Sequence, residues 1–241
     1  MIKLPFVLLL AVAITGCASQ QKFIDEIEAP EREVTRLVEI ELASIQAGEY
    51  CRQDPHSQFK GCDGALQRLT QLFTRFPDYE RLQLALAVAY QARNKTREAQ
   101  YYLDLLLNKD RPRPEAAILA ARLAMEEGNT RRALSLLEAQ KRLNPVHPGI
   151  HEALGAVYYL NHQPQNGFTA LASAEQLGAP AWRVAYHRGL LYELTKNESA
   201  ACEQYAKSYT LKRSFGLPEG RILGLTHNPI CLELAKYLGG A

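Results

Sequence analysis

The chain has 241 residues, of which 28 are Lys or Arg and 26 are Asp or Glu, so its formal net charge is +2. A charge balance this close to zero gives no reason to expect a nucleic-acid partner or binding to a strongly anionic surface. Five cysteines are present, which is enough for disulfide bonds if the chain is exported.

The first sixteen residues have the pattern of a signal peptide. Lys3 supplies a positive start, and an apolar run follows over residues 4–14, interrupted only by Pro5. That run is too short to cross a bilayer, which requires about 20 apolar residues. We therefore predict that residues 1–16 are removed.

The end of this segment, Ile14-Thr15-Gly16-Cys17, resembles the bacterial lipobox, in which cleavage precedes a lipidated cysteine. The resemblance implies that Cys17 carries the lipid and that the polar residues 17–31 form a tether to the fold. Residue 18 is Ala and not Asp, so the resemblance also implies anchoring in the outer membrane, facing the periplasm. The alternative is an ordinary secretory signal cut after Ala13.

The four remaining cysteines form an even set, which predicts two disulfides with three formal connectivities. Cys51 and Cys62 bracket a short segment rich in Gly, Asp, Pro and Ser, so we favour the pairs Cys51–Cys62 and Cys202–Cys231. A metal site formed by Cys51, His56 and Cys62 is the weaker alternative because no CxxC spacing is present.

Apolar residues next fall on helical stripes. The first stripe consists of Val34, Leu37, Val38, Leu42 and Ile45, and the second of Leu66, Leu69, Leu72 and Phe73. We expect two helices over residues 32–79, joined by an enlarged turn that contains Cys51 and Cys62.

From residue 65 onward, the same residue types return every 34 residues. A small residue recurs as Ala65, Ala99, Ala133, Gly167 and Ala201, and a larger one follows four positions later as Leu69, Leu103, Leu137, Leu171 and Tyr205. A third register contains Tyr90, Ala124, Tyr158 and Tyr192, preceded three residues earlier by Ala87, Ala121, Gly155 and Gly189.

These registers resemble the tetratricopeptide repeat (TPR), a 34-residue pair of antiparallel helices, over roughly residues 63–213. The resemblance implies an all-α, TPR-like α-solenoid in one domain, 32–241, with a modified first unit over 32–79. Its regular repeats are expected at about 80–113, 114–147, 148–181 and 182–215, followed by a cap over 216–241. Within the cap, Asn228 and Pro229 are typical of a helix start, which predicts a terminal capping helix.

Motifs of catalysis are missing from the sequence. It contains no G-x-S-x-G, H-E-x-x-H or Walker A pattern. His147 and His151 are four apart, but Pro148 lies between them, so surface histidines are favoured over a metal pair. We expect no enzymatic activity, cofactor, metal or small-molecule substrate, and an enzyme with an unrecognised His or Glu site is the alternative.

In the TPR fold, the first helix of each repeat lines the inner face. The resemblance implies partner binding by Arg81, Leu84, Gln91, Arg122, Met125, Tyr159, Arg183, Tyr186, Leu190 and Glu193, and places Val88, Ile118, Glu126, Glu152, Ala156 and Leu160 on the same face. Tyr159, Tyr186, Arg122 and Arg183 are the expected anchors. Leu84 and Val88 stand where clamps for C-terminal carboxylates have Lys and Asn, so such a clamp is not expected. The alternatives are binding at the outer face and an inner face that only packs internally.

Signal, size and repeat number together resemble pilus-assembly lipoproteins, namely the type IV pilus pilotin and its tight-adherence counterpart. The implied function is a non-enzymatic scaffold that binds an envelope protein or peptide in the concave groove. An adaptor for peptidoglycan enzymes or for polysaccharide export is the alternative.

Overall fold

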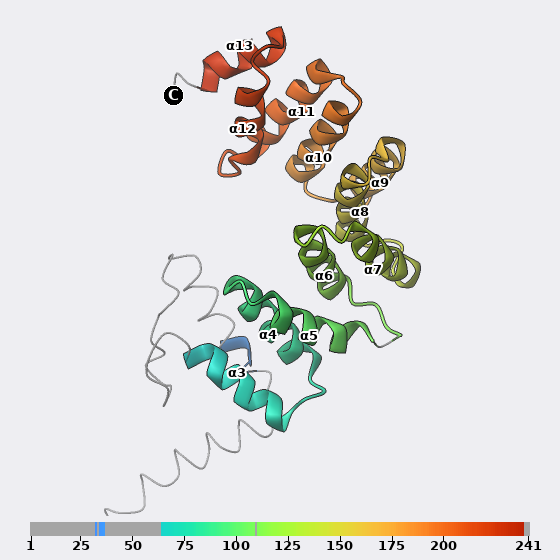
Figure 1. Ribbon diagram of the computed structural model, residues 1–241, viewed down its shortest axis with the longest axis vertical. Coiled ribbons are helices and arrows are strands. Elements are labelled where there is room, and N and C mark those ends of the chain that lie inside the picture. The colour runs from blue at the N-terminus through green and yellow to red at the C-terminus, as the bar shows by residue number, and fades with distance from the viewer. Residues whose placement is uncertain (1–31, 33, 37–63, 109, 239–241) are drawn as a thin grey trace, which may run out of the picture. The chain divides into compact units, whose positions relative to one another are not determined.

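The computed structural model describes residues 32, 34–36, 64–108 and 110–238 (Figure 1). The predictions for the signal peptide 1–16, the tether 17–31, Cys51 and Cys62 lie outside this part of the chain. Every regular element that is described is an α-helix, so the predicted all-α class is confirmed. None of the described helices is both long and apolar enough to span a bilayer.

The chain divides into two compact units, residues 1–105 and 106–241. The described helices of the first unit are α3 (Gly64–Arg75), α4 (Glu80–Ala92) and α5 (Thr96–Leu107), the last of which contains the boundary. An aromatic cluster of Phe73, Tyr90 and Tyr102 packs this unit, with ring centroids of Phe73 and Tyr102 5.1 Å apart. Burial raises the pKa of Tyr102 to about 12.

The second unit is a series of helix pairs in chain order (Figure 1). The pairs are α6 (Pro114–Glu126) with α7 (Thr130–Leu143), α8 (Pro148–Leu160) with α9 (Pro164–Gln176), and α10 (Ala181–Leu194) with α11 (Glu198–Leu211). Each helix also contacts the next pair, and the first helices touch one another, α6 with α8 and α8 with α10. One of these pairs falls in each of the stretches 114–147, 148–181 and 182–215, the last pair beginning one residue earlier, at Ala181.

Prolines begin three of these helices. Pro114, Pro148 and Pro164 occupy the first turn of α6, α8 and α9, where the missing amide hydrogen has no helical partner to lose. Proline therefore marks the starts of helices in this chain.

The turn inside each repeat uses one residue in the left-handed conformation, always at the same position. These residues are Asn94, Gly128, His162 and Lys196, with φ of 56°, 76°, 56° and 63°. The amide after each donates to the carbonyl five residues back, as in Lys95 to Tyr90 (3.0 Å) and Asn197 to Tyr192 (2.9 Å). This is the hydrogen-bond pattern that closes a helix on a left-handed residue.

The repeating small residues let the two helices of a pair approach closely. A Cβ on Gly155 would lie 2.5 Å from Cδ2 of Leu171, and one on Gly189 would collide with the ring of Tyr205. Leu171 and Tyr205 are fully buried. Two of the sequence registers therefore meet inside the pairs α8–α9 and α10–α11, small residue against large.

The C-terminal cap contains two helices where the sequence predicted one. Besides the expected α13 (Pro229–Leu238), the chain forms α12 (Leu217–Gly224), which buries Pro218 and Ile222 and contacts both α11 and α13. The Gly-rich and Pro-rich composition of residues 216–228 concealed α12. Its proline lies in the first turn, where helices tolerate it.

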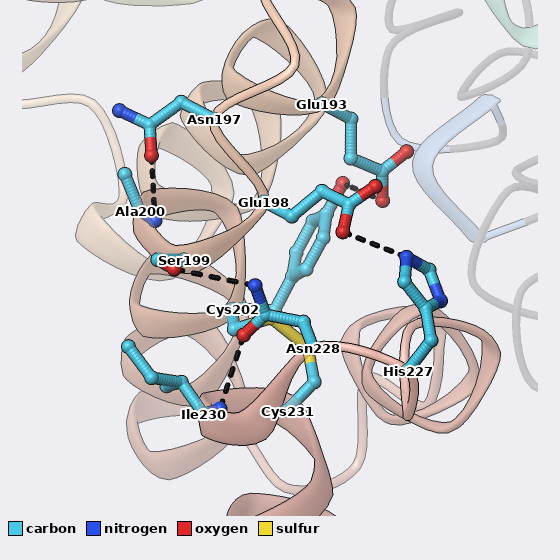
Figure 2. The surroundings of a disulfide bond; sticks show 11 residues. Glu193, Asn197, Glu198, Ser199, Ala200, Cys202, His227, Asn228, Ile230 and Cys231 are labelled. Carbon is cyan, nitrogen blue, oxygen red and sulfur yellow. Dashed lines mark hydrogen bonds and ion pairs between the residues drawn. A yellow bond between two sulfur atoms is a disulfide. The ribbon is translucent and has the colours of Figure 1, made fainter.

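The cap is covalently attached to the last repeat (Figure 2). Cys202 on α11 and Cys231 on α13 form the disulfide that was favoured from the sequence, with 5.4 Å between their Cα atoms. Asn228 caps α13 by accepting from the amide of Ile230 at 3.0 Å, and it donates to Ser199 at 3.2 Å. His227 lies 2.7 Å from Glu198, so polar contacts flank the disulfide.

Candidate functional site

A groove with a volume of about 500 Å³ runs along the first helices of the second unit. Its lining residues come from α6, α8, α10 and the segment after α11, and they are Ile118, Arg122, Met125, Glu152, Ala153, Ala156, Trp182, Arg183, Tyr186, His187, Phe215 and Leu217. A volume of this size is typical of ligand pockets. Most of the lining side chains are apolar.

Helical spacing explains how three helices contribute to one surface. Ile118, Arg122 and Met125 are separated by four and three residues and so share one face of α6. Arg183 and His187 are four residues apart on α10 and share its face in the same way. Because α6 contacts α8 and α8 contacts α10, these faces line up.

A buried carboxyl lies in the groove lining. Glu152 on α8 is 1% exposed, and its Oε2 lies 2.5 Å from Nη2 of Arg183 on α10. Burial raises the pKa of Glu152, and the neighbouring Arg183 and Arg122 oppose that rise. The pair joins adjacent repeats through an ionic contact in which the carboxyl is buried and the arginine is partly exposed.

His187 is the third member of this cluster. Its Nε2 lies 3.2 Å from Oε1 of Glu152. Burial lowers the pKa of His187 to about 4, and the positive charge of Arg183 lowers it further. His187 is therefore neutral near pH 7, and its buried Nδ1 has no hydrogen-bond partner among the described residues.

Arg122 differs from Arg183 in having no such contact. It is exposed near the middle of α6 and makes no hydrogen bond or ion pair with the described residues. Its electrostatic interaction is with Glu152, at longer range. In the groove, the guanidinium of Arg183 is therefore paired with a buried carboxyl, whereas that of Arg122 has no ion pair among the described residues.

Aromatic rings form the wall of the groove at its C-terminal end. The ring centroids of Trp182 and Phe215 are 4.7 Å apart, and Tyr186 packs edge-on against Phe215 at 5.2 Å. Lys212 places its Nζ 4.3 Å from the Trp182 ring centroid. Rings fixed by such contacts present a large, rigid apolar surface.

A second hollow adjoins the groove and shares Tyr186 and Leu217 with it. Its charged residues, Glu193 and Arg221, pair with each other at 3.2 Å. Glu193 also accepts a hydrogen bond of 2.9 Å from the buried hydroxyl of Tyr205, whose pKa burial raises. The two hollows together offer a path longer than either one.

Some of the predicted partner-binding residues line the groove or the second hollow. Arg122, Met125, Arg183 and Tyr186 line the groove, as do Ile118, Glu152 and Ala156, which were assigned to the same face. Glu193 lines the second hollow. These residues converge from three repeats of one unit.

Other members of the set lie elsewhere. Leu190 is 6% exposed and belongs to the core around Tyr205, and Tyr159 packs half-buried against that core. Arg81, Leu84 and Gln91 are on α4 of the first unit, where Arg81 is exposed and the other two are half-buried. Within the second unit, the predicted residues are therefore divided among the groove lining, the second hollow and the core around Tyr205.

Several lining residues were not anticipated from the sequence. Trp182 directly precedes Arg183, and His187 directly follows Tyr186. Ala153 follows Glu152. In each case the neighbour was assigned to the inner face and the lining residue itself was not. Phe215 is the final residue of the last predicted repeat and Leu217 lies beyond it in the cap, and neither belongs to the registers that recur every 34 residues. The signal that could have revealed His187 is its i, i+4 spacing from Arg183.

Among the described residues, no three His, Cys, Asp or Glu side chains are grouped so that they could hold a metal ion. The histidines His147 and His151 make separate contacts, His147 with Glu115 at 3.8 Å and His151 with the carbonyl of Pro145 at 2.7 Å.

Comparisons with known proteins agree with this architecture. Residues 62–123 match the family model described as tetratricopeptide repeat. No curated protein matches the chain in sequence. Among solved structures, the thermophilic TPR protein TTC0263 of Thermus thermophilus has 17% identity and a TM-score of 0.61, covering 78% of this chain and 96% of that one.

Two further structures give similar values. MamA (residues 41 to the end) from Desulfovibrio magneticus RS-1 has 17% identity and a TM-score of 0.55, covering 76% of this chain and 97% of that one. YrrB, a TPR protein with an unusual peptide-binding site, has 13% identity and a TM-score of 0.53, covering 82% and 96%. The recurring helix pairs and these structural matches show that the chain has the tetratricopeptide-repeat fold.

Proposed function

We propose that this chain is a non-enzymatic scaffold that binds an extended segment of a partner protein in the groove along α6, α8 and α10. The observation that carries the proposal is the groove itself, in which apolar and aromatic side chains surround a small number of charged groups. Large rigid rings and arginines are the residues that contribute most to protein interfaces. YrrB, which shares the fold, is a TPR protein with a peptide-binding site.

The proposal extends to where the scaffold acts. A lipid on Cys17 would hold the repeats at the inner surface of the outer membrane, where the scaffold assists the assembly of an envelope machine such as a pilus or secretion system. The lipobox-like residues Ile14 to Cys17 support this location, and the resemblance to pilus-assembly lipoproteins supports the role.

Site-directed photo-crosslinking in the native envelope tests the binding face. A photoreactive amino acid is placed at Met125 or Ala156 in the groove, or at the exposed residues Ser135 on α7 and Ala172 on α9 as matched controls. We expect the same partner to be trapped from both groove positions and from neither control. Adducts from Ser135 and Ala172 alone would mean that the outer face binds the partner.

A further inference from the structure

We infer that the groove selects partner segments in which an acidic side chain lies next to a large apolar residue, with Arg122 as the group that recognises the carboxylate. This inference rests on the proposed function, because it names the kind of segment that the same groove takes.

The charge of the lining points to an acidic ligand. Arg122 and Arg183 bring two positive charges, Glu152 is the single carboxyl, and His187 is neutral near pH 7. The lining is therefore net positive whether Glu152 is ionised or protonated. In the second hollow, Glu193 and Arg221 neutralise each other. Of the two hollows, only the groove therefore has an excess of positive charge in its lining.

The two arginines are not equivalent. Arg183 is held at 2.5 Å by a carboxyl that is 1% exposed, so its guanidinium is occupied by the fold. Arg122 is exposed, lines the same groove and has no ion pair or hydrogen bond among the described residues. A planar guanidinium with free donors binds a carboxylate through two parallel hydrogen bonds. Arg122 is thus the group that is available to a ligand.

The apolar part of the ligand follows from the neighbours of Arg122. Ile118 and Met125 flank it on α6, and the ring wall of Trp182, Tyr186 and Phe215 lines the other side of the groove. A ligand that consisted of a carboxylate alone would leave this apolar surface exposed to water. A segment with a large apolar residue beside its acid would cover both.

The carboxylate belongs to a side chain and not to a chain end. Clusters of free backbone amides, which capture chain ends in many proteins, are not available here, because the lining residues of α6 and α8 lie within helices whose amides are already bonded. The groove lining also contains neither Lys nor Asn, the pair that holds the C-terminal carboxylate in the TPR clamps described above. The adjoining second hollow, which shares Tyr186 and Leu217, gives the segment room to continue past the groove. An internal segment of a partner protein is the occupant that fits.

The test is a selection of random segments, each displayed inside a carrier protein so that it has no free terminus, on the full chain. We expect enriched segments to carry Asp or Glu beside a large apolar residue. Arg122→Gln should weaken their binding about tenfold, which corresponds to about 1.4 kcal/mol. Arg122→Glu should favour segments with Lys or Arg instead. Arg131→Glu, at an exposed position of α7 outside the groove, is the matched control and should change neither result.

The other outcomes separate the two proposals. Segments that are enriched without acidic residues and bind Arg122→Gln equally well, yet are lost with Ala156→Phe, would overturn this inference and leave groove binding intact. Binding that requires a free C-terminus would overturn the choice of a side-chain carboxylate. No enrichment, or enrichment unaffected by Ala156→Phe in a chain that keeps its helical circular-dichroism spectrum, would overturn both proposals.

Discussion

The ring of Tyr205 on α11 occupies the space beside Gly189 on α10 where a side chain of residue 189 would have to be. Tyr205 cannot easily move aside, because it is fully buried and its hydroxyl donates to Glu193 at 2.9 Å. The close approach of these two helices therefore depends on the absence of a single carbon atom.

Replacement of Gly189 by Ala should destabilise the second unit by about 1 to 3 kcal/mol, since the ring has to leave its position. Urea unfolding followed by circular dichroism measures this. Gly220→Ala is the matched control, because nothing lies within 4 Å of a Cβ there and the residue is inside α12. The control should be neutral or more stable by about 0.5 to 1 kcal/mol. Equal effects of the two substitutions would contradict the close approach.

The pair of Glu152 and Arg183 should matter for folding as well as for binding. Arg183→Met leaves a buried carboxyl without its cation, and the loss expected for breaking such a pair is about 3 kcal/mol. The double variant Glu152→Leu with Arg183→Met removes both charges and should be closer to the wild type. Urea unfolding of the wild type, the two single variants and the double variant at pH 7 forms a double-mutant cycle. Additive losses would show that the two side chains do not interact.

This expectation changes the role of Arg183. The sequence predicted Arg183 as an anchor for the partner, but in the structure it pairs with a carboxyl that is nearly inaccessible to water. Arg122, which is exposed, is the better position for testing binding alone.

Acid should destabilise the fold through His187. Burial lowers its pKa from 6.5 to about 4, so between these pH values the unfolded chain binds a proton that the folded chain does not. The contribution of the neutral His187 to the free energy of unfolding is complete above pH 6.5. It is lost as the pH falls toward 4, by up to about 3 kcal/mol. Glu152, which faces His187 from α8, acts in the opposite direction because burial raises its pKa. Protonation of Glu152 therefore favours the folded state as the pH falls.

His187→Asn should remove the destabilising part of this pH dependence. The free energy of unfolding, measured in urea at steps from pH 7 to 4, should fall less steeply for the variant than for the wild type. Arg183 is the other charged neighbour of His187, and both proteins contain it. Parallel curves for the two proteins would rule out His187 as the titrating group.

Reduction of Cys202–Cys231 should loosen the C-terminal cap. The bond joins residues 29 apart, for which the chain-entropy model gives about 3 to 4 kcal/mol. Because a repeat contacts only its neighbours, the amides of α13 should exchange faster in deuterated water, while those of α6 and α7 keep their protection. Double substitution of both cysteines by Ala should reproduce the effect without reductant. Faster exchange across the whole unit would mean that the cap is not a separate element.

Lipidation of Cys17 is tested by labelled fatty acid. The label should enter the wild-type chain and not the Cys17→Ser variant, and the wild type should fractionate with the outer membrane. A soluble product that begins near Ile14 would favour the ordinary secretory signal.

The helix pairs could be predicted from the sequence because their packing repeats. Gly155 meets Leu171 and Gly189 meets Tyr205, and the same contact 34 residues later requires the same residue sizes. The Cys202–Cys231 pair was also predictable, since both cysteines lie on helices expected at the C-terminal end.

The groove was only partly predictable from the sequence. The position of a residue in a repeat tells which face of the helix it lies on, but not how deeply neighbouring helices bury its side chain. Leu190 follows the rule for inner-face residues, yet the neighbouring α11 buries it against Tyr205. Phe215 and Leu217 contribute from a segment without periodicity, so no repeat rule could place them. Glu152 and Arg183 carry opposite charges on adjacent repeats, but their burial depends on how closely α8 and α10 pack.

The left-handed turns imply that thermal tolerance and ligand choice can change independently in this protein. Asn94, His162 and Lys196 hold side chains in a conformation that costs about 1 kcal/mol or more for residues other than glycine, whereas the equivalent Gly128 does not. Glycine at His162 or Lys196 would relieve that strain, offset in part by its greater freedom in the unfolded chain. Neither residue lines the groove or the second hollow. Selection for heat resistance can therefore act on these turns while the surface that chooses a partner stays as it is.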